Sequence, residues 1–340
     1  MSDAINITNR LHLSTFIQSA RAQSALSDGD ANTMWQSAWS LAASINTRVA
    51  SSPLPPNPAL LDIDLHDLWH TYWHGAINTA PDSPKLDRLA LQIIQAREQG
   101  VLTREQTSET SRVSLEAMAS NGQRLWTDLP FLVEDMAAHW TNGCAEMSSA
   151  QRLSGAQFLA LLAAAGGAVD DAICGVGLVV LREALETPRP LGTLGAADGD
   201  PGRQIGGMSV ADLLPAANVW LFTAGWKLVR LSDGGWEGGD GVGLGELVTS
   251  GRYRWEVPRH GGFSPQRWMW WLRRLDEIAS KVEDGNADEL GGFGAFVKGM
   301  MDNMLHIAAQ TNGPVGQAAQ QAGGMVRHRP QVRVLGPARP

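Results

Sequence analysis

Apolar residues recur at three- and four-residue steps along most of this chain, which is the spacing of a helix that buries one face. Many of these positions carry tryptophan, of which the chain has thirteen against two tyrosines. The segment Leu60–Thr79 shows the pattern well, with Leu65, Trp69 and Tyr72 on one face. Strand patterns are weak, and the best candidate for a strand is the short segment Arg252–Val257. The sequence therefore predicts an all-α fold.

We expect about nine or ten helices in a single multi-helix bundle or array. They are expected at Asn9–Leu26, Asp30–Val49, Leu60–Thr79, Ser83–Gln99, Leu129–Trp140, Ser148–Ala165, Asp170–Glu186, Ser209–Leu231, Ser264–Val282 and Ala287–Gln310. Some starts carry capping chemistry, because Ser83 precedes Pro84 and Ser264 precedes Pro265, which favours a serine N-cap followed by proline at the first helical position. Residues 100–123 are polar and weakly patterned.

Two glycine-rich loops and a basic tail interrupt the helical pattern. Pro188–Gly207 and Asp233–Gly251 are rich in Gly and Asp, and loops of this length act as functional lids or are disordered insertions. From Thr311 the chain consists mostly of Gln, Ala, Gly, Pro and Arg, with little to bury. We therefore expect one all-helical domain over residues 1–310 and a disordered basic tail over residues 311–340.

Composition excludes several classes of protein. The net charge of -8 argues against a nucleic-acid partner, because phosphate binding needs a surplus of Lys and Arg. Two cysteines, Cys144 and Cys174, cannot form a disulfide framework, and the N-terminus shows no secretory signal. The longest apolar passage, Phe158–Val180, is interrupted by Asp170 and Asp171, so no membrane span is expected. These features predict a cytoplasmic protein.

Six blocks of sequence, most of them built around tryptophan, follow one another in a recognisable order. They are LWHTYWHGAINTAPDSPKLDRLALQII (Leu68–Ile94), LWTDLPFLVEDMAAHW (Leu125–Trp140), LREALE (Leu181–Glu186), ADLLPAANVWLFTAGWKLVRLS (Ala211–Ser232), SPQRWMWWLRRL (Ser264–Leu275) and AFVKGMMDNM (Ala295–Met304). Over about residues 60–310 the chain resembles a family of ascomycete proteins that carry a domain of unknown function. The resemblance implies an all-helical intracellular protein whose relatives sometimes lie beside specialised-metabolite genes. It supplies no catalytic residues.

A stripe of histidines is the sharpest chemical pattern. His66, His70 and His74 follow at four-residue steps on Leu60–Thr79, roughly opposite its apolar face. Two histidines at positions i and i+4 can hold one metal ion, but a site needs a third protein ligand and oriented partners. The sequence supplies neither an HExxH motif nor a second histidine pair. We therefore interpret the stripe as a solvated face and expect no metal.

Asp170 and Asp171 raise a second alternative, the paired carboxylates of a terpene cyclase. Such magnesium sites need several oxygen ligands, and no further aspartate follows within helical reach. An acidic helix start that the helix dipole stabilises is the simpler interpretation. The sequence also contains no GxSxG elbow and no Walker loop, so we expect no cofactor.

Aromatic clusters are the remaining candidates for a site. Most aromatic side chains at helical spacing pack between helices in the core. The alternative is a tryptophan-walled pocket with a few polar groups, which is the general form of a small-molecule site. The residues predicted to bind a ligand are Trp69, His70, Trp73, Asp135, Trp220, Trp226, Arg230, Trp268, Trp271 and Arg273. No catalytic residue is predicted.

Two functions from different classes follow. The first is a protein of fungal specialised metabolism that binds an apolar small molecule, as a cofactor-independent cyclase or isomerase (pericyclase-like) if it is an enzyme. The second is a helical protein–protein interaction module without activity, whose tail docks a partner. A closed aromatic cavity favours the first, and a filled interior beside an exposed apolar patch favours the second.

Overall fold

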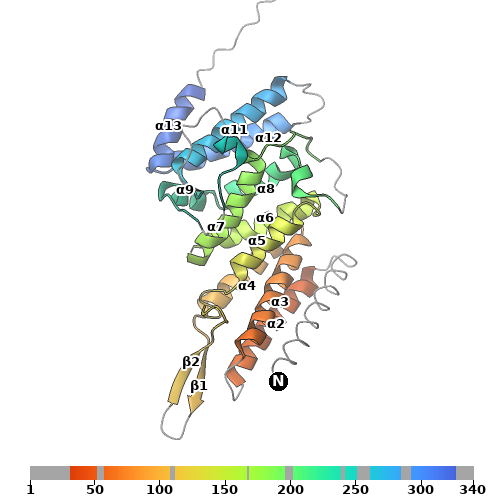
Figure 1. The fold of residues 1–340 in the computed structure, drawn as a ribbon, viewed down its shortest axis with the longest axis vertical. Coiled ribbons are helices and arrows are strands. Elements are labelled where there is room, and N and C mark those ends of the chain that lie inside the picture. The colour runs from red at the N-terminus through yellow and green to blue at the C-terminus, as the bar shows by residue number, and fades with distance from the viewer. Residues whose placement is uncertain are drawn as a thin grey trace, which may run out of the picture.

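A computed structural model shows the chain as an elongated array of α-helices with one short β-hairpin (Figure 1). The structure describes residues 31–51, 57–107, 112–166, 168–195, 202–238, 242–250, 261–284 and 292–326. The all-α prediction is confirmed within these ranges. The expected helix Asn9–Leu26 and the candidate strand Arg252–Val257 lie outside the described residues.

The described residues form twelve α-helices, two short helical turns and two strands. The elements are α2 (Ala31–Ser51), α3 (Pro58–Ile77), α4 (Pro84–Glu98), β1 (Thr103–Thr107), β2 (Arg112–Glu116), α5 (Leu132–Gly143), α6 (Ser149–Ala164), α7 (Ala168–Leu181), the π-helical turn η1 (Arg182–Glu186), the 3-10 turn η2 (Ile205–Gly207), α8 (Val210–Thr223), α9 (Gly225–Asp233), α10 (Glu246–Thr249), α11 (Pro265–Asp284), α12 (Phe293–Ala309) and α13 (Pro314–Val326). Among them, no helix is long and apolar enough to cross a membrane.

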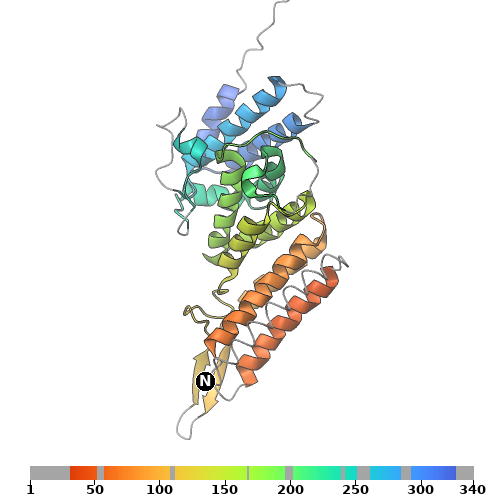
Figure 2. The same cartoon turned by 45° about the vertical axis from the view of Figure 1, so that its right-hand side comes forward.

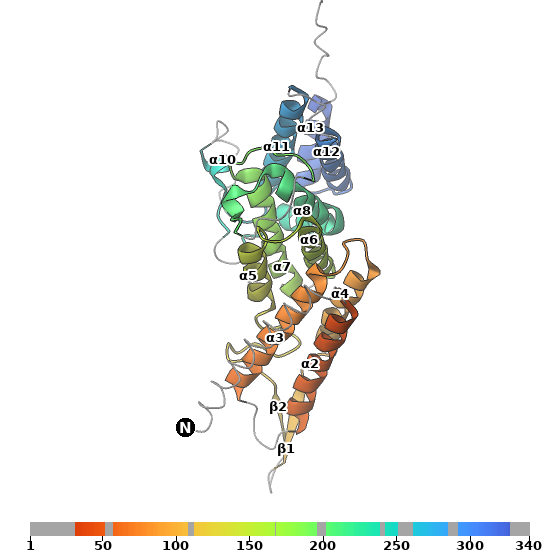
Figure 3. The same ribbon diagram turned by 90° about the vertical axis from the view of Figure 1, so that its right-hand side faces the viewer.

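The helices are stacked along the long axis of the molecule. One end holds α2, α3 and the β-hairpin, and the opposite end holds α11, α12 and α13 (Figures 1 and 3). Helices α2 and α3 run side by side, as Figure 2 shows. In the middle, α6 packs against α3 and α4 and also against α7 and α8. The buried apolar side chains form one cluster that extends from Ala38 to Ala319.

Several helices begin where the capping residues predict. The Ser83 hydroxyl accepts a hydrogen bond from the backbone N–H of Lys85 at the start of α4. Ser209 forms a capping box with Asp212 at the start of α8. The single helix expected over residues 209–231 is divided at Ala224 into α8 and α9.

The β-hairpin differs from the sequence-based expectation. Strands β1 and β2 pair antiparallel, with Thr103 opposite Glu116 and Thr107 opposite Arg112, inside the segment that shows no clear pattern. Their sequences, TREQT and RVSLE, are mostly polar on both faces. Alternation of apolar and polar residues marks a strand that buries one face, and these mostly polar strands do not show it.

Residues 314–326, which lie inside the expected tail, form the helix α13. Val315 and Ala319, one helical turn apart, are buried in the core cluster. The backbone N–H of Val315 donates to Asp233 Oδ1 at 2.7 Å, so a side chain from α9 caps the new helix. That cap is distant in sequence, which is why the local composition did not reveal it. Residues 327–340 lie outside the described part.

Helices α7 and α8 approach closely at a glycine. A Cβ atom added to Gly177 would lie 2.6 Å from Cε3 of Trp220, and that indole is fully buried. We expect Gly177→Ala to lower the free energy of unfolding by about 1–3 kcal/mol, because the added methyl group overpacks a fixed contact. Urea denaturation measures the change.

Gly299 of α12 is the matched control, since a Cβ there meets no atom within 4 Å. Gly299→Ala should raise stability by about 0.5–1 kcal/mol, because alanine favours the helix over the unfolded chain. The two substitutions should have opposite signs. An equal effect at both glycines would mean that helix propensity, and not the contact with Trp220, decides the outcome.

Candidate functional site

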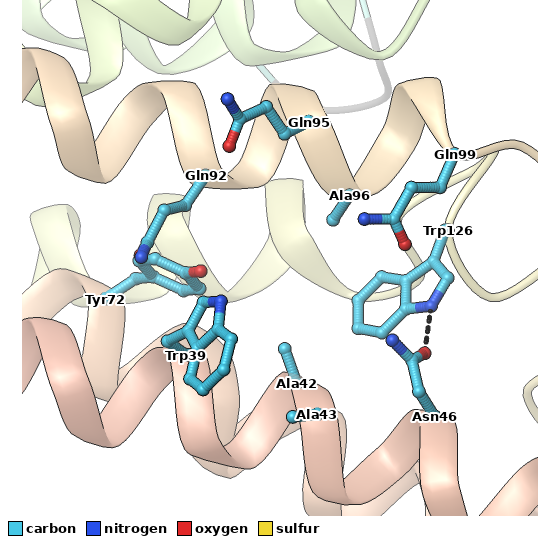
Figure 4. A pocket seen from close by; sticks show the side chains of 10 residues that line it. All are labelled: Trp39, Ala42, Ala43, Asn46, Tyr72, Gln92, Gln95, Ala96, Gln99 and Trp126. Carbon is cyan, nitrogen blue, oxygen red and sulfur yellow. Dashed lines mark hydrogen bonds between the residues drawn. The ribbon is translucent and has the colours of Figure 1, made fainter.

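A hollow of about 200 Å³ lies between α2 and α4, with Tyr72 of α3 in its wall; we call it the α2–α4 hollow (Figure 4). Its lining side chains are aromatic, small or amide-bearing. They are Trp39, Ala42, Ala43, Asn46, Tyr72, Gln92, Gln95, Ala96, Gln99 and Trp126. This volume is below the roughly 300–1,000 Å³ of pockets for drug-sized ligands, so it suits a molecule of one or two rings.

Three elements and one loop residue position the walls. The alanines of α2 leave room between that helix and α4, and Trp39 stands at the rim with 62% of its surface exposed. Tyr72 of α3 and Trp126 are almost fully buried. The indole Nε1 of Trp126 donates to Asn46 Oδ1 at 2.7 Å, which fixes both side chains. The hollow is therefore a partly open slot with aromatic walls.

The polar groups of the slot are neutral. Among the described residues, the lining contains no Asp, Glu, Lys, Arg or His. Burial raises the pKa of the Tyr72 phenol, so its hydroxyl stays protonated at physiological pH. Gln92 Oε1 is buried and accepts no hydrogen bond from the described residues. Figure 4 shows Gln92 reaching from α4 toward Tyr72 and Trp39.

A second cluster of functional groups joins α3 to α5. His66 Nδ1 lies 2.8 Å and 3.0 Å from the two carboxylate oxygens of Asp135, and this hydrogen bond raises the pKa of His66. The ring of His70 lies 4.2 Å from His74 and 5.2 Å from His139, measured between centroids. His139 carries no such signal in the sequence, because only the packing of α5 on α3 brings it to the stripe.

Burial keeps two histidines of this cluster, His74 and His139, neutral at physiological pH. Burial, together with the charge of His139, lowers the pKa of His74 to about 4. Burial also lowers the pKa of His139, whose ring stacks on Trp73 at 5.8 Å. Within the described residues, no group of three or more His, Cys, Asp or Glu is arranged to hold a metal ion.

The turn before α5 carries unusual backbone conformations. Leu129 and Phe131 have φ values of 48° and 65°, in the region that residues with a side chain seldom adopt. The carbonyl of Pro130 between them accepts a hydrogen bond from Trp69 Nε1 at 2.7 Å, and Phe131 packs on His66 at 4.6 Å. These contacts hold the turn, and α5 begins at Leu132 instead of the expected Leu129.

The ten predicted ligand-binding residues lie in several separate groups on the described helices. Trp69, His70, Trp73 and Asp135 come together along α3 and α5, and Trp268 and Trp271 contact each other on α11. Trp220 is buried against α7, Trp226 and Arg230 are exposed on α9, and Arg273 is half-buried on α11. None of the ten lines the α2–α4 hollow.

The carboxylates of the terpene-cyclase alternative have an ordinary role where they are described. Asp171 pairs with Lys227 and lies 3.7 Å from Arg230, so α9 neutralises it. The side chain of Asp170 lies outside the described residues. Burial raises the pKa of the Cys144 thiol to about 11, which keeps it protonated near neutral pH.

A family model matches residues 69–275, which is more than half of the chain, and its description is "Protein of unknown function (DUF3632)". The chain belongs to the DUF3632 family. The match begins in α3 and ends in α11, so it includes Tyr72, Gln92 and Trp126. Trp39 and Asn46 of α2 precede the DUF3632 match.

One curated relative supports the fungal setting of this DUF3632 protein. It is "Oxopyrrolidines biosynthesis cluster protein G" from Penicillium oxalicum (strain 114-2). The two sequences are 31% identical over 284 residues, which cover 81% of this chain and 75% of the relative. The expected resemblance to a fungal family near specialised-metabolite genes is confirmed. No solved structure matches the chain significantly.

Proposed function

We propose that the chain binds a small neutral molecule with one or two rings in the α2–α4 hollow, as part of fungal specialised metabolism. The observation that carries this proposal is the wall of Trp39, Tyr72 and Trp126 without a charged side chain. Aromatic walls with a few polar groups are typical of sites for small organic ligands. The relative's name, which places it in a cluster for oxopyrrolidine biosynthesis, is in keeping with a small ring compound.

As an enzyme, the chain would be a cofactor-independent cyclase or isomerase. Tyr72 is the only ionisable side chain among the described lining residues, and its neutral hydroxyl is a poor acid and a poor base at pH 7. Rate acceleration in the hollow would come from holding a flexible substrate in the conformation that closes a ring. We place this function in the cytoplasm, since both described cysteines are buried as free thiols.

The test uses the full chain and a panel of neutral one- and two-ring compounds, followed by calorimetry. Trp39→Ala removes the exposed wall of the hollow. We expect affinity for the best compound to fall about tenfold, or about 1.4 kcal/mol, since one aromatic contact is lost. Chromatography of the recovered compound shows whether it has been isomerised.

Trp226→Ala is the matched control. Trp226 is 53% exposed, similar to Trp39, but lies on α9 and does not line the hollow. Its substitution should leave the affinity unchanged. The proposal is wrong if no compound of the panel binds, or if both tryptophan variants bind as tightly as the parent chain.

A further inference from the structure

The Tyr72 hydroxyl is a polar group that points into the α2–α4 hollow. Tyr72 is 3% exposed, and Figure 4 shows its oxygen directed from α3 into the space between α2 and α4. Burial alone raises the pKa of this phenol, and no hydrogen bond to a described residue contributes to the shift. A buried hydroxyl without a hydrogen bond costs free energy. A ligand in the hollow can therefore gain affinity by accepting a hydrogen bond from Tyr72.

Asn46 presents a second donor to the hollow. An indole N–H can only donate, so the carboxamide atom that lies 2.7 Å from Trp126 Nε1 is Asn46 Oδ1. The N–H₂ group of Asn46 points away from this contact, and Figure 4 shows it on the side of the hollow. Trp39, whose indole borders the hollow, can also only donate. Trp39 and Asn46 are residues i and i+7 of α2, about 10 Å apart along the helix axis, so donors stand at both ends of the hollow.

The described lining offers fewer acceptors than donors to a bound molecule. Asn46 Oδ1 already accepts from Trp126, and Gln92 Oε1 is itself fully buried, so a ligand does not reach it. Gln95 and Gln99 are exposed, and their carboxamides can bond to water. A ligand donor that finds no acceptor loses its hydrogen bond to water and gains nothing in return. The lining therefore favours a ligand that accepts hydrogen bonds and donates none.

From this arrangement we infer that the ligand of the α2–α4 hollow is a neutral ring ketone with a second oxygen acceptor at the opposite end of the ring. The inference rests on the proposed function and names the class of its ligand. The ketone oxygen accepts from the Tyr72 hydroxyl, and its second lone pair can accept from the Trp39 indole. The other oxygen accepts from the N–H₂ group of Asn46. The ring itself lies against the aromatic walls of the hollow.

Other neutral compounds fit these donors less well. A phenol, an alcohol or a secondary amide brings a polar hydrogen of its own, which has to find one of the few acceptors in the lining. A hydrocarbon ring leaves the Tyr72 hydroxyl buried without a partner. Sites built to bond a polar group reject analogues that lack it, often strongly. The ketone oxygen should therefore decide affinity.

The experiment measures the affinity of the full chain for three probes by calorimetry: 4-chromanone, chromane, which lacks the ketone, and 1-tetralone, which lacks the ring oxygen. We expect 4-chromanone to bind at least about tenfold more tightly than chromane, and several-fold more tightly than 1-tetralone. Tyr72→Phe keeps the aromatic wall and removes only the hydroxyl, so it should abolish the preference over chromane. Without a ligand, this variant should be as stable as the parent chain, because no hydrogen bond to a described residue is lost.

Asn46→Asp tests the second donor. The aspartate still accepts from Trp126 but has no N–H₂ group, so the preference for 4-chromanone over 1-tetralone should disappear. Ser44→Asp is the matched control, since Ser44 is an exposed residue of α2 that does not line the hollow. It places the same charge on the same helix and should keep both preferences.

The possible results separate this inference from the proposed function. If all three probes bind equally and Trp39→Ala weakens them all, the hollow is a ligand site but the ketone assignment is wrong. If Tyr72→Phe keeps the parent preference for 4-chromanone over chromane, the assignment is wrong as well. If no probe and no compound of the wider panel binds, both proposals fail. Thermal unfolding of each variant confirms that it is folded.

Discussion

Replacing Glu186 with glutamine should lower the free energy of unfolding by about 3–5 kcal/mol, because it leaves a buried guanidinium without its counter-charge. Glu186 and Arg267 are both fully buried and form a bidentate pair, with Nε to Oε1 at 2.6 Å and Nη2 to Oε2 at 2.9 Å. Trp271 Nε1 also donates to Oε1, and the backbone N–H of Gly245 donates to Oε2. All four contacts are made to the two carboxylate oxygens, and a glutamine keeps only one of these acceptors.

The same pair anchors the glycine-rich insertion to the core. Arg267 Nη1 donates to the carbonyls of Gly261 and Gly262, and Gly245 lies against Glu186 so closely that a Cβ would meet its side chain at 2.4 Å. The loss of Glu186 should therefore also release the loop that contains Gly245. Limited proteolysis should detect new cleavage there, alongside the shift in the urea midpoint.

An exposed ion pair provides the control for charge removal. Glu283 of α11 pairs with Lys298 of α12, and both side chains are 58% exposed. Glu283→Gln should change stability by less than about 1 kcal/mol, since water and salt screen the pair. A similar loss in both variants would contradict the view that burial makes the Glu186 pair critical.

The helices were predictable because their signals are local. The start of α4 follows from Ser83 and Pro84, which act within one turn of the chain. The apolar stripe on α3 likewise identified Trp69 and Tyr72 as inward-facing, and both are buried. The start of α13 was not predictable, since its capping carboxylate comes from Asp233 on another helix.

The hollow was not predictable, because it depends on which side chains the packing leaves uncovered. The sequence weighted all tryptophans alike, yet Trp220, Trp268 and Trp271 fill helix seams, while Trp39 borders the hollow. Gln92 showed no feature that separates it from a solvated glutamine of α4. Only the pairing of α2 with α4 and α3 gives these residues a common space. The histidine stripe on α3 was predictable from its four-residue spacing. His139 was not, because it lies on α5 and reaches the stripe only through packing.

Acidification should destabilise the fold through His74 and His139, because burial lowers the pKa of both side chains. His74 has a pKa of about 4 in the folded chain and an ordinary value near 6.5 when unfolded. The unfolded state therefore binds more protons below about pH 6.5, and stability falls as the pH falls through that value toward 4. Between pH 7 and pH 5, His74 alone should cost about 2 kcal/mol.

His74→Gln should remove this part of the pH dependence, because glutamine does not titrate. The groups that face His74 shape the remainder: the lowered pKa of His139 adds to the loss, whereas His66, paired with Asp135, acts in the opposite sense. The raised pKa of His66 stabilises the fold below about pH 6.5 and loses that contribution as the pH rises. Urea unfolding at pH 7 and pH 5 gives the two slopes. His306→Gln, at an exposed histidine of α12, should keep the parent slope, and an unchanged slope in His74→Gln would show that other groups govern the acid response.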